Sequence, residues 1–112
     1  MLNINGIEWK VILVPPNHPI LQRDNGYWTL GACSNDTKTI YISDELPNEK
    51  LKKVLCHEIT HASMFSYQIT LTLDQEELLA DLLASYGAEI VEKTNKIFRI
   101  IQKNKGSNYY YK

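Results

Sequence analysis

The sequence predicts an α+β fold, in which a small, mainly antiparallel three-stranded sheet is followed by two long packed helices. Stretches 7–14 and 27–43 are rich in β-branched and aromatic residues and are bounded by Pro, Gly and Asn, as is typical of strands and turns. Stretches 48–67 and 72–103 instead repeat apolar residues at helical spacing. With 112 residues, 44% of them hydrophobic, the chain is large enough for one domain with a core.

The domain limits follow from where this patterning stops. We expect a single domain over residues 1–105. Residues 106–112 contain Gly-Ser-Asn followed by three tyrosines and a lysine, and we expect them to form a flexible C-terminal tail.

The strand region divides into one strand and one hairpin. Residues 7–14 alternate and form the first expected strand, which the Pro-rich stretch 15–19 ends. Residues 27–33 and 38–43 are the expected arms of a hairpin, because the Ser, Asn, Asp and Thr between them favour a turn.

The first helix is expected from Asn48 to about Tyr67, because this stretch contains no Gly or Pro and Pro47 lies where a helix begins. At about 100° per residue, its apolar side chains share one face. That face consists of Leu51, Val54, Leu55, Ile59, Ala62 and Phe65.

The second helix is expected to continue past Gly87 to about Lys103. Its apolar residues recur at helical spacing and form the expected core stripe, which consists of Leu79, Leu83, Tyr86, Ile90 and Ile97. Its start is open: Thr72 or Asp74 could be the N-cap, with Gln75 or Glu77 completing a capping box.

Residues 57–61 have the sequence His-Glu-Ile-Thr-His, which is the His-Glu-x-x-His pattern of zinc hydrolases. Positions four apart lie one above the other on a helix, so His57 and His61 could bind the same metal ion. Glu58 falls in the middle of the apolar face, where an unpaired carboxylate is costly. It is well placed to take a proton from a metal-activated water.

A third ligand must come from elsewhere in the chain, because catalytic zinc usually has three protein ligands and one open position. The start of the second helix offers Glu76 and Glu77. Glu77 is favoured because Asp81 follows on the same face and could accept the outer ring N–H of a ligating histidine. Glu76 remains an alternative ligand, and both acids could instead be first-turn charges favoured by the helix dipole.

The pentapeptide at 57–61, followed by Glu77-x-x-Ala80-Asp81, resembles the gluzincin branch of the zincin metallopeptidases. It is most similar to the short ImmA/IrrE-type metallo-endopeptidases, which phages and mobile elements often encode. The resemblance covers roughly residues 27 to 91.

This resemblance implies a role for each residue of the motif. His57, His61 and Glu77 would be the zinc ligands and Glu58 the general base. Asp81 would hold the ring of His57, the first histidine of the motif.

The resemblance also implies an order of strands and a route for the substrate. In zincins the strand before the motif helix is central and its hairpin partner lies at the edge above the cleft. Residues 38–43 would therefore be central and residues 27–33 would form the edge. Leu30, Gly31 and Ala32 would then bind an extended polypeptide by strand addition.

A donor for the oxyanion of peptide hydrolysis is also needed, and a Tyr or His usually supplies it. Tyr41, Tyr67, Tyr86 and His18 are unranked candidates.

Composition argues against several other classes of function. A formal net charge of -1 offers no electrostatic basis for binding nucleic acid or a membrane surface. No apolar run approaches the ~20 residues of a membrane span, and the start of the chain lacks a signal-peptide layout. Two cysteines, Cys33 and Cys56, suggest free thiols in a reducing cytoplasm.

The sequence therefore predicts zinc-dependent hydrolysis of a polypeptide substrate, with a metal-activated water and Glu58 as the general base. The alternative is a zinc-binding regulatory or protein-interaction module without protease activity, which would act through an unidentified protein partner. A purely structural zinc site needs no base, so Glu58 argues against this alternative. A third interpretation is a metal-free helical hairpin in which these acids and histidines form a buried polar network.

Overall fold

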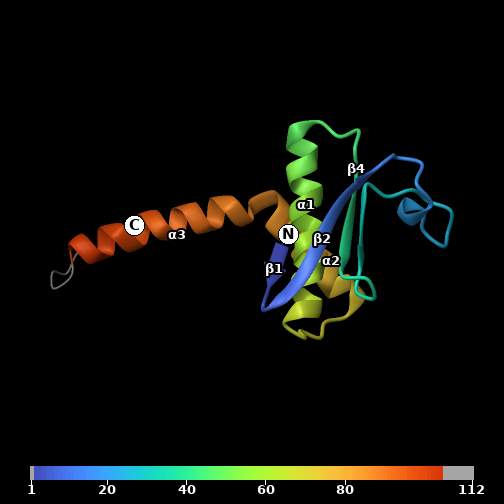
Figure 1. Ribbon diagram of the computed structural model, residues 1–112. Coiled ribbons are helices and arrows are strands. Elements are labelled where there is room, and N and C mark those ends of the chain that lie inside the picture. The colour runs from blue at the N-terminus through green and yellow to red at the C-terminus, as the bar shows by residue number, and fades with distance from the viewer. Residues whose placement is uncertain (1, 105–112) are drawn as a thin grey trace.

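The sheet of this molecule has four strands and mixed pairing (Figure 1). In the computed structural model, which describes residues 2–104, the strands are β1 (Leu2–Ile4), β2 (Ile7–Val14), β3 (Gly31–Ser34) and β4 (Thr39–Ser43), in the order β1-β2-β4-β3. β2 and β4 are parallel, whereas the β1–β2 and β3–β4 pairs are antiparallel. The α+β class is confirmed, but the prediction of three mainly antiparallel strands is wrong.

The extra strand, β1, is too short for its alternation to be recognised in the sequence. It pairs with β2 so that Leu2 faces Trp9. Asn5 and Gly6 join the two strands with φ angles of 51° and 80°. Two successive positive φ angles are what a two-residue type I′ hairpin turn requires, and Asn-Gly is its most common sequence. That dipeptide is the signal that could have predicted the hairpin.

The parallel pairing of β2 and β4 arises because the chain between them leaves the sheet and returns. The connection contains a 3-10 turn (Pro19–Leu21), and the fully buried Leu21 anchors it to the domain. Only then does the chain form β3, which begins at Gly31 rather than at residue 27. Just before it, Trp28 makes an isolated bridge to Gln22. The expected placement of residues 38–43 inside the sheet and β3 at its edge agrees with the observed order.

Helix α1 (Asn48–Ser66) packs against the sheet and carries the predicted apolar face. Ala62 from this face joins Trp9, Ile40 and Ile42 in the buried core. Leu51, Val54, Leu55 and Ile59 pack around that core. The Trp9 indole N–H donates a 2.7 Å hydrogen bond to the hydroxyl of Ser66, which ties the end of α1 to β2.

The second helical stretch has three parts: α2 (Leu73–Leu82), a π-helical turn (Leu83–Gly87) and α3 (Ala88–Lys103). α2 packs on α1, whereas α3 extends away from the rest of the domain (Figure 1). No residue of α3 is buried, and Leu83, Tyr86 and Ile90 are 38%, 57% and 52% exposed. The expected core stripe is therefore wrong beyond α2, because α3 extends away from the sheet and α1, and no part of the described chain buries its apolar face.

No helix within residues 2–104 is both long enough and apolar enough to cross a membrane. The stretch predicted to be a flexible tail, 106–112, lies outside the described residues.

Candidate metal centre

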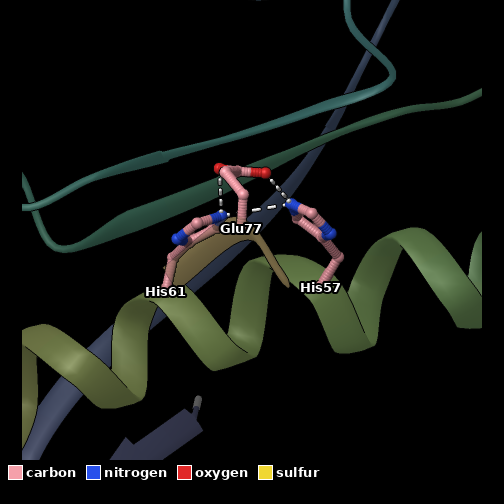
Figure 2. Close-up of side chains that lie close together, drawn as sticks. All are labelled: His57, His61 and Glu77. Atoms are coloured by element: carbon pink, nitrogen blue, oxygen red, sulfur yellow. Dashed lines mark hydrogen bonds and ion pairs between the residues drawn. The ribbon is translucent and has the colours of Figure 1, made fainter. Parts of the chain in front are cut away.

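Two histidines of α1 and one glutamate of α2 converge on one point (Figure 2). His57 and His61 lie one helical turn apart and their Nε2 atoms approach to 3.1 Å. Glu77 reaches across from α2, with one carboxylate oxygen 3.1 Å from Nε2 of His57 and the other 3.0 Å from Nε2 of His61. These three side chains form a cluster that could hold a metal ion, because each offers one ligand atom and all lie within 4.8 Å of one another.

The start of α2 determines which acid reaches this cluster. The Thr72 hydroxyl accepts a 3.2 Å hydrogen bond from the backbone N–H of Gln75, and the Gln75 side chain accepts one of 3.0 Å from the backbone N–H of Thr72. This reciprocal pair is a capping box, so Thr72 is the N-cap and Glu77 is not the box partner. The carboxylate of Glu77 is thereby left to face α1.

The outer nitrogens of both histidine rings also contact carboxylates. Asp81 Oδ1 lies 3.0 Å from Nδ1 of His57, and Glu76 Oε1 lies 2.6 Å from Nδ1 of His61. Sequence reasoning considered Glu76 only as an alternative ligand or a first-turn charge, and missed its contact with His61. Because adjacent residues on a helix point about 100° apart, Glu76 and Glu77 can contact opposite sides of the same imidazole.

The chemistry of this donor set fits a cation. The Asp81 and Glu76 carboxylates are placed to accept the Nδ1–H of the two rings, and in that tautomer both Nε2 atoms present lone pairs toward the Glu77 carboxylate. In that tautomer the facing acceptors, 3.0–3.1 Å apart, would repel unless a cation, either a metal ion or a proton, lay between them. Around a tetrahedral zinc ion with bonds of about 2.0–2.2 Å, ligand atoms are about 3.3–3.6 Å apart, a few tenths of an ångström more than the observed 3.0–3.1 Å.

Glu58 lies beside the cluster and is buried, with 6% of its surface exposed. Burial raises the pKa of its carboxyl above the ordinary value, and the charge of Glu77 raises it further, although the two histidines oppose this shift. Gly31 of β3 is directly opposite: a Cβ there would lie 3.0 Å from Cγ and 3.1 Å from Oε2 of Glu58. The absence of a side chain at Gly31 thus lets the edge strand pass close to this carboxylate.

A hollow of about 530 Å³ opens beside these residues. His57, Glu58, Glu77 and Asp81 line it together with the edge-strand residues Leu30 and Gly31. A neighbouring hollow of about 240 Å³ is lined by Ala32, along with Glu58, His61, Glu76 and Glu77. All three residues expected to border a substrate cleft therefore lie next to the metal cluster.

A family comparison agrees with this geometry. Residues 12–96 match the model of a peptidase family described as the IrrE N-terminal-like domain. The chain belongs to this family. That membership confirms the resemblance to ImmA/IrrE-type metallopeptidases drawn from the motif. Searches of curated proteins and of solved structures find no significant match.

The four candidate oxyanion donors of this IrrE-like domain lie elsewhere. Within residues 2–104, neither hollow is lined by Tyr41, Tyr67, Tyr86 or His18. The His18 ring instead stacks on Tyr41, with 6.5 Å between centroids. Arg23, which sequence reasoning did not single out, lines both hollows. It comes from the loop between β2 and β3, and nothing in the local sequence indicates which way that loop folds.

The cysteines are not part of the cluster that could hold a metal. Burial raises the pKa of the Cys33 thiol to about 12, and the nearby Glu58 and Glu76 carboxylates add to the shift. A thiol with this pKa stays protonated at neutral pH and is therefore a poor metal ligand or nucleophile.

Proposed function

We propose that this IrrE-like domain is a zinc-dependent endopeptidase of the gluzincin type. The observation that carries the proposal is the position of the buried Glu58 carboxyl. It lies between a His-His-Glu donor cluster and a peptide-sized hollow bordered by an edge strand.

His57, His61 and Glu77 would hold the metal, and the choice of zinc rests on the donor chemistry. Two imidazoles and one carboxylate are the ligand set of several zinc peptidases, and such a set leaves a fourth position open. Asp81 and Glu76 would each fix one imidazole in the tautomer that turns Nε2 inward and would raise its basicity. A zinc ion held there would act as a Lewis acid and lower the pKa of a water molecule.

Glu58 would move the proton in this reaction. Its carboxylate accepts a proton from the attacking water and returns it to the nitrogen of the departing amine. A pKa raised by burial suits the first step, because a stronger base accepts the proton more readily. Arg23 lines both of the hollows that Glu58 lines, and its positive charge would stabilise the oxyanion that develops on the carbonyl.

The polypeptide substrate would add to the free edge of β3. Leu30, Gly31 and Ala32 border this edge. The Leu30 carbonyl accepts a hydrogen bond from the Ser43 N–H of β4, so by alternation it is the backbone of Gly31 that would face the bound peptide. Because Gly31 has no side chain, β3 packs directly against Glu58, which would hold a peptide added to this edge close to that carboxylate.

The test is Glu58→Gln in zinc-loaded protein. We expect kcat for peptide hydrolysis to fall by about 10²-fold to 10⁴-fold, because the proton acceptor is lost. Zinc content should be unchanged, since Glu58 is not one of the three clustered ligand groups. Glu92→Gln on α3, the same chemical change on an exposed surface, should leave both quantities unchanged. A Glu58→Gln protein with undiminished hydrolysis would contradict the proposal, as would zinc-loaded wild-type protein that cleaves no member of an unbiased peptide library.

A further inference from the structure

The hollow beside the metal cluster has a cationic border. Arg23, Lys50 and Lys53 all line it, and all three are exposed. Within residues 2–104, none of the three side chains forms an ion pair or a hydrogen bond. Three cations therefore line one cavity in a chain whose formal net charge is -1, and of these Arg23 interacts electrostatically with Glu58.

The acids of the same hollow do not neutralise this border. Glu77 and Asp81 are both within 3.1 Å of a histidine nitrogen, and Glu58 is buried. These carboxylates belong to the metal centre, whereas Lys50 and Lys53 lie nearer to the start of α1. The field of the two lysines therefore extends into the part of the hollow farthest from the acids.

Spacing along α1 places the two lysines relative to the reaction site. At 1.5 Å per residue, Lys53 is about 6 Å and Lys50 about 10 Å along the axis from His57. An extended peptide rises about 3.3 Å per residue, so these distances correspond to about two and three residues from the scissile bond.

The cleft has a different set of lining residues on the other side of the metal cluster. Here Ala32, Cys33, Phe65 and Leu73 line the smaller hollow, and Lys is missing from its described lining. The two lysines line only one half of the cleft, whereas the other half has these apolar side chains together with Arg23 and Glu76, so the two halves are chemically different.

We propose that this chain prefers polypeptides carrying acidic residues two to three positions to one side of the scissile bond, where Lys50 and Lys53 bind them. This preference rests on the proposed peptidase function and narrows it to a substrate class. Arg23, at the centre of the cleft, adds attraction for the whole acidic segment, and the lysines determine on which side of the bond it lies.

The experiment compares matched peptides on zinc-loaded protein. One peptide carries two Glu residues on the amino side of the cleaved bond, a second carries them on the carboxyl side, and the controls have Gln at the same positions. We expect kcat/KM to favour one of the two Glu peptides over its Gln control by about 5-fold to 20-fold, because two exposed ion pairs are formed. The preference should shrink as salt is added.

The variant that tests the residues is Lys50→Gln/Lys53→Gln. Its preference for the favoured Glu peptide over the Gln control should fall to below about 2-fold. Lys52→Gln is the matched control, because Lys52 is exposed on the same helix but lines neither hollow. It should retain the wild-type ratio.

The proposal is overturned if Gln peptides are cleaved as well as both Glu peptides, if acids on both sides are equally favoured, or if Lys52→Gln lowers the ratio as much as the double variant. Equilibrium binding of the same peptides to zinc-loaded Glu58→Gln separates this proposal from the peptidase function. Acid-dependent binding without any hydrolysis by wild type would support the cationic subsite and contradict the peptidase. Hydrolysis with no preference for acidic peptides would support the peptidase function and contradict the cationic subsite.

Discussion

Helices α2 and α3 are parts of one nearly continuous helical stretch, yet they differ in how they pack against the rest of the molecule. α2 packs on α1, buries Ala80 and directs Glu76, Glu77 and Asp81 at the two histidines. α3 buries none of its side chains, although its apolar residues are at least as regularly spaced. The Glu89–Lys93 ion pair, one turn apart on α3, is exposed on both sides.

The difference shows that an apolar face predicts a helix but does not predict what covers it. α2 has α1 within reach because the connection from Ser66 to Leu73 is short, whereas α3 lies beyond the π turn and buries no residue. Variants in α1, α2 and the core should therefore change stability and metal binding, whereas the same changes in α3 should not.

The largest expected effect separates the core from α3. Trp9→Ala should lower the free energy of unfolding by about 3–5 kcal/mol, because Trp9 is fully buried and its N–H bonds to Ser66. Phe98→Ala on α3 should change it by less than about 0.5 kcal/mol, since Phe98 is 58% exposed. Urea unfolding measures both, and a comparable loss at Phe98 would mean that α3 has a partner surface in solution.

Glu77→Gln tests the difference between α2 and α3 through its effect on zinc binding. Zinc affinity should fall more than 100-fold, beyond the roughly 10–100-fold that changes outside the ligand set cost, because a coordinating charge is removed. Glu92→Gln on α3 removes one charge from an exposed position and should have no such effect. Competition with a chelator measures both affinities, and equal affinities in the two variants would exclude Glu77 as a ligand.

The two acids that contact the outer ring nitrogens should have intermediate effects. Asp81→Ala and Glu76→Ala should each lower zinc affinity by about 10–100-fold. The loss of zinc affinity should be larger for Glu76→Ala than for Asp81→Ala. The Glu76 side chain is 17% exposed and that of Asp81 is 71% exposed, so water screens the Asp81–His57 contact more than the Glu76–His61 contact. Titration of each purified variant with zinc tests this order, and unchanged affinity for Asp81→Ala would show that its carboxylate faces solvent.

The smallest effect concerns the cost of burying Glu58 in metal-free protein. Because burial raises its pKa, folding favours the protonated carboxyl. Its contribution to stability is complete below the ordinary value of 4.5 and is lost as pH rises through the raised value. Gln cannot ionise, so Glu58→Gln should have a higher Tm than wild type at pH 7, and the gap should close toward pH 4. Thermal unfolding with a chelator present tests this, with Glu92→Gln as the control that shows no such gap.

Local patterns in the sequence were sufficient for the elements that depend on near neighbours. The first strand, the first helix and its apolar face follow from periodicity, and the one-turn spacing of His57 and His61 brings their Nε2 atoms within 3.1 Å. The hairpin of β3 and β4 follows from its turn residues, although its first arm begins later than expected. Each of these features involves residues close in the chain, whose geometry backbone sterics and side-chain spacing largely determine.

Tertiary structure decided everything that required distant segments to meet. Local periodicity does not predict the parallel pairing of β2 with β4, the contact of Glu76 with His61, the position of Arg23 beside the same hollow as Glu58, or the exposure of α3. The physical reason is that burial and pairing depend on which surface lies opposite. A helix or strand with one apolar face is compatible with many partners, and only the packing of the whole chain selects among them.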